Sequence, residues 1–202
     1  MERIERERQE LTARLRRVST AGRVAFAAAC SERLLRGVEA AGAEGDTQAR
    51  RILDLLWQSA ADYRFVDRKQ DLRDLLEEVE DGISDEFELP AGTEAAEEVA
   101  QFASDAVVET LACSVSHEPH MAANAAAAVW NALVAYATRE DDVDSGTSAF
   151  EQAFYDSTLM RTELAAEEAD LAFVAAHPDL NDDQAAEIRR RARQNPLALF
   201  GL

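Results

Sequence analysis

The sequence contains few residues of several kinds, and each shortage excludes a class of protein. Only two cysteines occur in 202 residues, Cys30 and Cys113, so a framework of disulfide bonds is excluded. The four prolines and eight glycines form no long linker between domains. The longest apolar stretch, residues 121–137, is mostly alanine and shorter than the roughly 20 residues that span a bilayer. We therefore expect a globular protein with two buried, reduced thiols.

Cations are nearly absent from the middle of the sequence. Between Asp74 and Glu187 there are 28 Asp and Glu residues and only two cations, Arg139 and Arg161, so this segment has a formal charge near −26. The whole chain carries −19 because residues 1–73 are nearly balanced and four arginines follow at positions 189–193. A surface this negative repels nucleic-acid phosphates and anionic lipids and attracts cationic proteins. We expect a basic protein as partner, with no nucleic acid and no membrane.

Two further features concern the cell that makes the protein. Residues 2–8 are charged from the first turn and lack the apolar core of a signal peptide, so we expect a cytoplasmic protein. Lys69 is the single lysine beside twenty arginines. This bias is typical of a high-GC coding background or of salt adaptation, and in either case the acidity is also explained as a general property of the proteome.

Apolar residues recur every three to four positions along most of the chain, which predicts helices and no strand. We expect an all-α bundle of about seven or eight helices that forms a single domain over residues 1–202, with residues 195–202 as an apolar C-terminal tail. The third helix, beginning near Asp46 and carrying Trp57, is expected at the centre of the core. The helices are predicted at about 2–18, 20–41, 46–63, 67–79, 93–115, 119–138, 147–176 and 181–194.

Three of these helices are expected to begin at the N-caps Asp46, Asp67 and Thr93, and residues 83–92 are expected to form a loop. Pro119 fits the first turn of a helix, and Asn181 with Gln184 resembles a capping box.

Three stretches of the N-terminal third resemble a known family. They are Val24-Ala-Phe-Ala-Ala-Ala-Cys-Ser-Glu-Arg-Leu34, the pair Gly45-Asp46, and Arg50-Arg-Ile-Leu-Asp-Leu-Leu-Trp57. In residue type and spacing they are similar to the YjaG-like family of uncharacterised bacterial proteins, domain of unknown function 416. The resemblance implies one all-helical, cytosolic domain whose biochemical role is not established, and it brings no catalytic residues.

The polar residues of these stretches form the first candidate site. Glu32, Arg33, Asp54 and Trp57 stand beside apolar helix faces, where they would line a groove shared by the family. The alternative is a set of interhelical ion pairs that brace the core, because charges near a core are generally paired.

Acidic turns form the second candidate site. Asp85, Glu86 and Glu88 precede the fifth helix, and Asp141, Asp142 and Asp144 follow the sixth. We consider three roles for these carboxylates: solvated loop charge, a docking surface for a cationic protein, and a Ca²⁺ or Mg²⁺ site. Neither turn has the twelve-residue pattern of a calcium loop.

Two other groups have simpler explanations. Cys113, His117 and His120 are zinc-ligand types, but the two histidines are one residue short of the His-Glu-x-x-His spacing and Pro119 separates them. We therefore predict no metal and no cofactor. Arginines 189, 190, 191 and 193 occupy the last turns of a helix, where positive charge opposes the helix dipole, and we expect them to pair within the chain with the acidic segment between Asp74 and Glu187.

No phosphate-binding loop and no Gly-x-Ser-x-Gly elbow occurs, so we expect a non-enzymatic role. The charge favours a protein-binding module, for example an inhibitor or immunity protein of a basic partner. One alternative is a structural or regulatory homo-oligomer, such as a homodimer formed through the long seventh helix or the tail. The other is a carboxylate- or metal-dependent hydrolase.

Overall fold

The computed structural model describes residues 2–40, 48–62, 69–79, 94–141, 148–194 and 197, and all regular structure in these ranges is α-helical. This confirms the all-α expectation, with nine helices over the described ranges where about seven or eight were predicted. The helices are α1 (Glu2–Leu15), α2 (Thr20–Ala40), α3 (Gln48–Asp62), α4 (Lys69–Glu78), α5 (Glu94–Ser116), α6 (Pro119–Asp141), α7 (Ser148–Asp156), α8 (Thr158–Ala176) and α9 (Asp182–Gln194).

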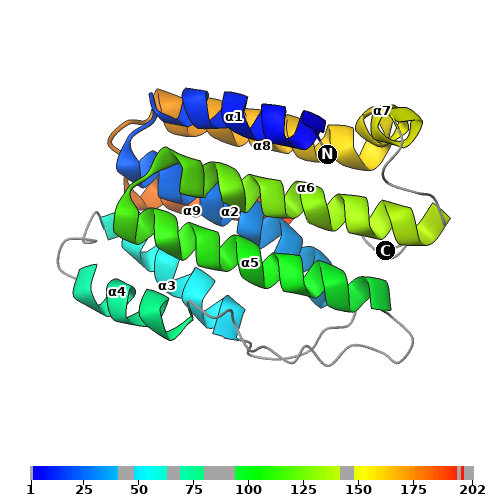
Figure 1. Ribbon diagram of the computed structural model, residues 1–202. Coiled ribbons are helices and arrows are strands. Elements are labelled where there is room, and N and C mark those ends of the chain that lie inside the picture. The colour runs from blue at the N-terminus through cyan, green and yellow to red at the C-terminus, as the bar shows by residue number, and fades with distance from the viewer. Residues whose placement is uncertain are drawn as a thin grey trace.

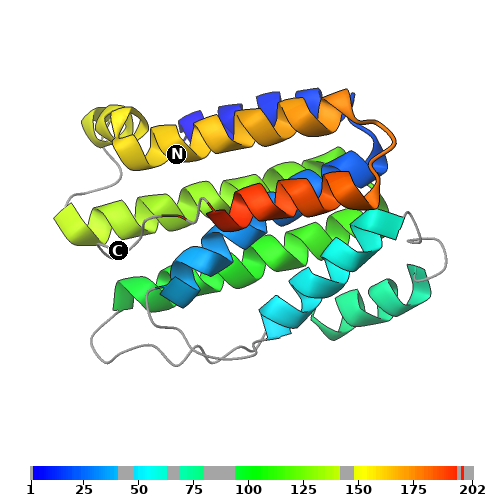
Figure 2. The same cartoon turned by 180° about the vertical axis from the view of Figure 1, so that it is seen from behind.

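The helices lie in three layers, which are visible from the front and from behind (Figures 1 and 2). One outer layer contains α1 and α8, and α7 precedes α8 at one end. The middle layer contains α2, α6 and α9, and the other outer layer contains α3, α4 and α5 (Figure 1). Helix pairs that follow one another in sequence, α5 with α6 and α2 with α3, contact each other, as do the sequence-distant pairs α1 with α6 and α2 with α9.

Helix α2, not the third helix, takes the centre of the core. It contacts α3, α5, α6, α8 and α9, and its residues from Val24 to Leu35 are all buried. A helix that is buried all round needs small side chains on several faces, and the run Ala27-Ala28-Ala29 provides them. Helix α3, by contrast, leaves Arg51 and Gln58 exposed.

The long helix expected over residues 147–176 is wrong, because the chain breaks at Ser157 into α7 and α8. Ser157 has an extended backbone, with φ −63° and ψ 151°, and its hydroxyl accepts a hydrogen bond from the backbone N–H of Met160 at 3.2 Å. Serine is a favoured N-cap residue because its side chain satisfies an otherwise free N–H of the first turn. One short polar residue therefore ends one helix and begins the next.

Other predicted helix ends are confirmed. Pro119 is the first residue of α6, and Asn181 and Gln184 exchange two hydrogen bonds of 3.0 Å at the start of α9, as a capping box does. The expected N-caps Asp46, Asp67 and Thr93 and the loop from Ile83 to Gly92 lie outside the described residues.

One hydrophobic cluster contains residues from every helix, α1 to α9, and includes Cys30 and Cys113, which are buried and free as expected. Of the expected tail, Leu197 is described: it is 5% exposed, and its N–H donates to the carbonyl of Arg33 at 3.4 Å. The division into domains stays a prediction. Over the described ranges, none of the helices is both long and apolar enough to cross a bilayer.

Candidate functional site

The first polar network surrounds Glu32, a carboxylate of α2 that is fully buried. Arg50 of α3 donates to Glu32 at 2.7 Å, the indole N–H of Trp57 donates at 3.0 Å, and Arg193 of α9 donates at 3.0 Å. Burial opposes the ionisation of Glu32, but the charges of Arg50 and Arg193 hold its pKa below its usual value. This network fastens α3 and α9 to the central helix.

Asp54 joins the same network from α3. It pairs with Arg189 of α9, and Arg193 lies 3.7 Å away. The guanidinium of Arg189 also lies over the ring of Trp57, with its carbon 5.8 Å from the ring centroid. Three of the four residues predicted for the family groove, Glu32, Asp54 and Trp57, are thus brought together. The two carboxylates pair with arginines of the same chain, and Trp57 donates to Glu32. A functional role for this group stays a prediction.

Arg33, the fourth predicted groove residue, lies in a separate and more deeply buried cluster. It is 1% exposed, and its guanidinium bonds Glu163 of α8 at 2.8 to 3.1 Å and Asp170 at 2.5 Å. Glu163 and Asp170 are also nearly fully buried. Burial opposes the charge of Arg33, but Glu163 and Asp170 hold its pKa well above its usual value. The sequence neighbours Glu32 and Arg33 therefore serve different networks.

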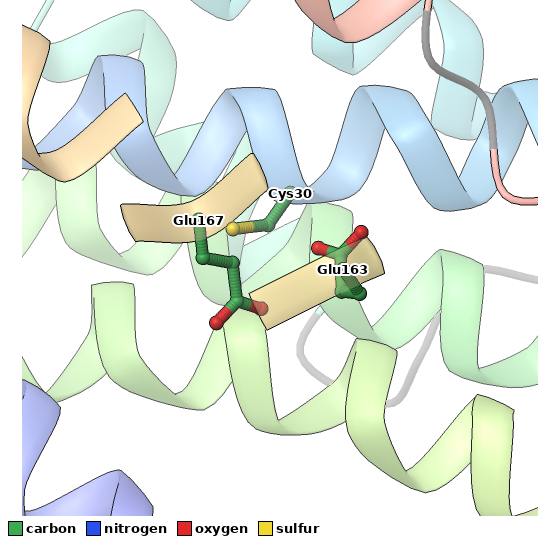
Figure 3. Close-up of side chains that lie close together, drawn as sticks. All are labelled: Cys30, Glu163 and Glu167. Carbon is green, nitrogen blue, oxygen red and sulfur yellow. The ribbon is translucent and has the colours of Figure 1, made fainter. Parts of the chain in front are cut away.

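Beside Arg33 lie three potential metal ligands, Cys30 of α2 and Glu163 and Glu167 of α8 (Figure 3). Their donor atoms lie within 4.8 Å of one another. Burial and the neighbouring Glu163 raise the pKa of Glu167 well above its usual value, and burial likewise raises the pKa of the Cys30 thiol. The indole N–H of Trp130 donates to Glu167 at 2.8 Å.

This chemistry does not suit a cation. Thiol and carboxyl groups bind metals in their deprotonated forms, and burial disfavours these forms of Cys30 and Glu167. A metal ion would also compete with the guanidinium of Arg33 for Glu163. We interpret the cluster as an internal brace that joins α8 to α2.

The other sequence candidates are placed as follows. Cys113 is buried in α5. The two histidines lie at the junction between α5 and α6, where His117 has a left-handed backbone with φ 63° and His120 lies 4.0 Å from Glu118. The arginine run pairs within the chain, and two of its four members, Arg190 and Arg191, pair with the acidic segment as expected. Arg190 and Arg191 pair with Glu187 at 2.8 and 3.0 Å, whereas Arg189 and Arg193 pair with residues of the N-terminal third.

The acidic turns are not placed. Asp85, Glu86, Glu88, Asp142 and Asp144 lie outside the described residues, and Asp141 is the last residue of α6. The proposed docking role of these six residues stays a prediction.

A groove that the sequence reasoning missed lies between α1, α5 and α6. Its volume is about 620 Å³. The floor is formed by the alanines Ala127 and Ala128 of α6, whose small side chains leave space between the flanking helices. The walls combine apolar and acidic side chains from α1 and α5, including Ile4, Glu5, Phe102, Asp105, Val108 and Glu109.

The polar side chains of the groove form one chain of hydrogen bonds and one separate pair. Arg8 donates to Glu5 at 2.7 and 2.9 Å and to the side-chain oxygen of Asn124 at 2.8 Å. Asn124 in turn donates to Glu109 at 3.2 Å, and Gln101 donates to Asp105 at 3.0 Å. Glu5 thus has a cationic partner, whereas Asp105 and Glu109 accept from neutral amides. Burial, with the nearby charge of Asp105, raises the pKa of Glu109.

The sequence contained a signal for the buried acids of the Arg33 cluster, although our prediction did not include them. Glu163, Glu167 and Asp170 follow Met160 and precede Val174 on one helical stripe, so three acids replace apolar residues at buried positions. The groove had none, because alanines at its floor have the same pattern as alanines in a packed core.

Comparison with known proteins gives a family and a fold. A family model described as "Protein of unknown function (DUF416)" matches residues 10–202. The crystal structure of a DUF416 family protein from Shewanella baltica OS155 is similar over 95% of this chain and 98% of that one, with a TM-score of 0.74 and 20% identity. At that identity the likeness shows the fold. No curated protein matches the sequence.

Proposed function

The chain belongs to the DUF416 family of proteins of unknown function, and for this member we propose a binding role in which the groove between α1, α5 and α6 receives a cationic segment of a partner protein. The observation that supports the proposal is the combination of an apolar, alanine-floored groove with two carboxylates that bond only to amides among the residues described. An inhibitor or immunity protein of a basic enzyme is a concrete form of this role.

The shape of the groove suits an amphipathic helix. Its floor on α6 extends from Asn124 to Asn131, which is about 10 Å at 1.5 Å per residue, or two helical turns. Apolar side chains on α1 and α5, including Ile4, Phe102 and Val108, would face the apolar stripe of such a helix. Docking of one amphipathic helix face into a groove is a recurring mode of peptide recognition.

The charges of the groove favour a basic occupant. A lysine or arginine of the partner would reach Asp105 and Glu109 without breaking an internal ion pair, because the present donors to these carboxylates are amides. The net charge of −19 also steers a cationic protein toward the chain and speeds encounter. Charge sets the class of partner, and the apolar floor supplies contact area.

A synthetic probe tests this proposal. We would titrate the protein into a fluorescein-labelled helical peptide of about 14 residues, with leucines at i, i+3, i+4 and i+7 and lysines elsewhere, and follow anisotropy at several salt concentrations. The variant Asp105→Asn/Glu109→Gln should weaken binding at least about tenfold, or ~1.4 kcal/mol. Because the cation favours ionised Glu109, wild-type affinity should also rise as pH increases through the raised pKa of this residue.

The matched control removes the same charge elsewhere. Asp179 and Asp183 are exposed and do not line the groove, so Asp179→Asn/Asp183→Asn should change the affinity little. Equal losses in the two double variants would mean that the peptide senses only the net charge, and the groove would lose its role.

A further inference from the structure

We propose that the cationic segment is anchored by one branched aliphatic side chain, which enters a small cavity at the α7 end of the groove. This inference rests on the proposed function and adds the feature by which the groove would select its partner. The cavity lies between the first turns of α1, the middle of α6, and α7, and its volume is about 40 Å³. Most of its lining is apolar and comes from Ile4, Val134, Phe150, Phe154 and Tyr155.

The cavity and the groove are neighbours. Ile4 and Asn131 line both, so a segment lying in the groove passes the mouth of the cavity. A water molecule needs about 10–15 Å³ of such volume, so the cavity has room for about three waters or for the tip of one leucine or isoleucine. An apolar side chain suits it better than water, because most of the walls offer no hydrogen bond.

Packing is incomplete at this corner. Protein interiors are close-packed, with few voids larger than a water molecule. Here an unfilled volume lies beside Phe150 and Phe154, whose rings stack at 5.9 Å. An inserted aliphatic side chain would fill this volume.

The walls of the cavity are held in place before any segment binds. The backbone N–H of Arg3 donates to Glu151 of α7 at 3.2 Å, and the guanidinium of Arg3 lies 3.8 Å above the ring of Tyr155. These contacts tie the first turn of α1 to α7. A preformed pocket binds more tightly than one that must be ordered during binding.

The test combines a cavity-filling variant with a leucine scan of the probe peptide. Val134 lines the cavity but not the groove, so Val134→Phe should fill the cavity and leave the groove intact. Each leucine of the lysine–leucine peptide is changed to alanine in turn, and the affinity is measured by anisotropy. With the wild type, one position should lose about tenfold or more, as an anchor does. With Val134→Phe, the affinity for the unsubstituted peptide should fall, and alanine at that position should cost no more affinity than alanine at the other leucine positions.

Two controls keep the result interpretable. Val115→Phe enlarges a half-buried valine of α5 that lines neither the groove nor the cavity, and it should leave the scan unchanged. Val134→Leu replaces Val134→Phe if circular dichroism shows that the larger residue unfolds the protein. If binding depends on Asp105 and Glu109 but the leucines are equivalent, or filling the cavity has no effect, the anchor is wrong and the groove stands. If the acids do not matter either, the proposed function fails.

Discussion

Replacement of Arg33 by methionine should be among the most destabilising substitutions in the protein. The side chain is 1% exposed, and its guanidinium bonds two carboxylates that are themselves almost inaccessible, Glu163 at 1% and Asp170 at 3% exposed. Methionine has about the length of the apolar stem of arginine and lacks the guanidinium. Arg33→Met therefore keeps most of the apolar packing and removes the cation from both partners.

The expected loss of unfolding free energy follows from the two buried carboxylates that the substitution leaves without a cation. Breaking a buried pair by deleting one partner costs roughly 3–5 kcal/mol, because the remaining charge stays buried without compensation. Here one guanidinium serves two acids, so we expect the upper part of that range, out of a total stability of roughly 5–15 kcal/mol for a domain. Burial raises the pKa of Asp170, so without the cation this carboxyl can avoid unpaired charge by taking up a proton, and the loss should be smaller at mildly acidic pH than at neutral pH.

Urea unfolding, followed by circular dichroism at the two pH values, measures the loss. The control is Arg14→Met, which removes an exposed arginine that lies 2.6 Å from Glu168 and should cost roughly 0–1 kcal/mol. If both variants lose a similar small amount, or the loss caused by Arg33→Met does not depend on pH, the buried network does not brace α8 against α2 as argued.

Three other substitutions test separate features by the same unfolding assay. Burial raises the pKa of Glu167 above its usual value near 4.5, so between the two pKa values folding takes up a proton and the unfolding free energy falls as pH rises. Glu167→Gln should make the unfolding free energy less dependent on pH; a variant whose free energy falls with pH as steeply as that of the wild type would contradict this. Gly22→Ala would place a Cβ 2.7 Å from Val18, and overpacking of about 1–3 kcal/mol should exceed the ~1 kcal/mol gain in helix propensity; a stabilised variant would refute this. Ser157→Ala should cost about 1 kcal/mol by removing the cap bonded to Met160, and no loss would show that the cap is dispensable.

Much of the fold was readable from local patterns. Periodic apolar residues placed most of the helices, and Pro119 and the pair Asn181 and Gln184 placed helix ends, because these signals act within one turn. The break at Ser157 was missed, since a serine inside a long amphipathic pattern is also compatible with an uninterrupted helix.

The candidate sites were harder to predict because each one joins distant segments. The sequence marked Glu32 and Arg33 as adjacent polar residues on a buried helix, and it placed both near the core. Successive residues of a helix point about 100° apart, so Glu32 and Arg33 face different neighbours. The sequence did not show that these neighbours are α3 and α9 for Glu32 and α8 for Arg33, because the partners come from distant segments.

By itself, the sequence determined the all-helical class, the charge of −19, the family and two buried thiols, because these depend on composition, periodicity and short motifs. The tertiary structure decided which charges are neutralised inside the chain and where a groove remains. Ala127 and Ala128 could equally have been covered, and they form a floor because α1 and α5 pack on either side of them. Side-chain size is a property of the residue, but whether it produces a tight contact or an open groove depends on how the neighbouring helices are spaced.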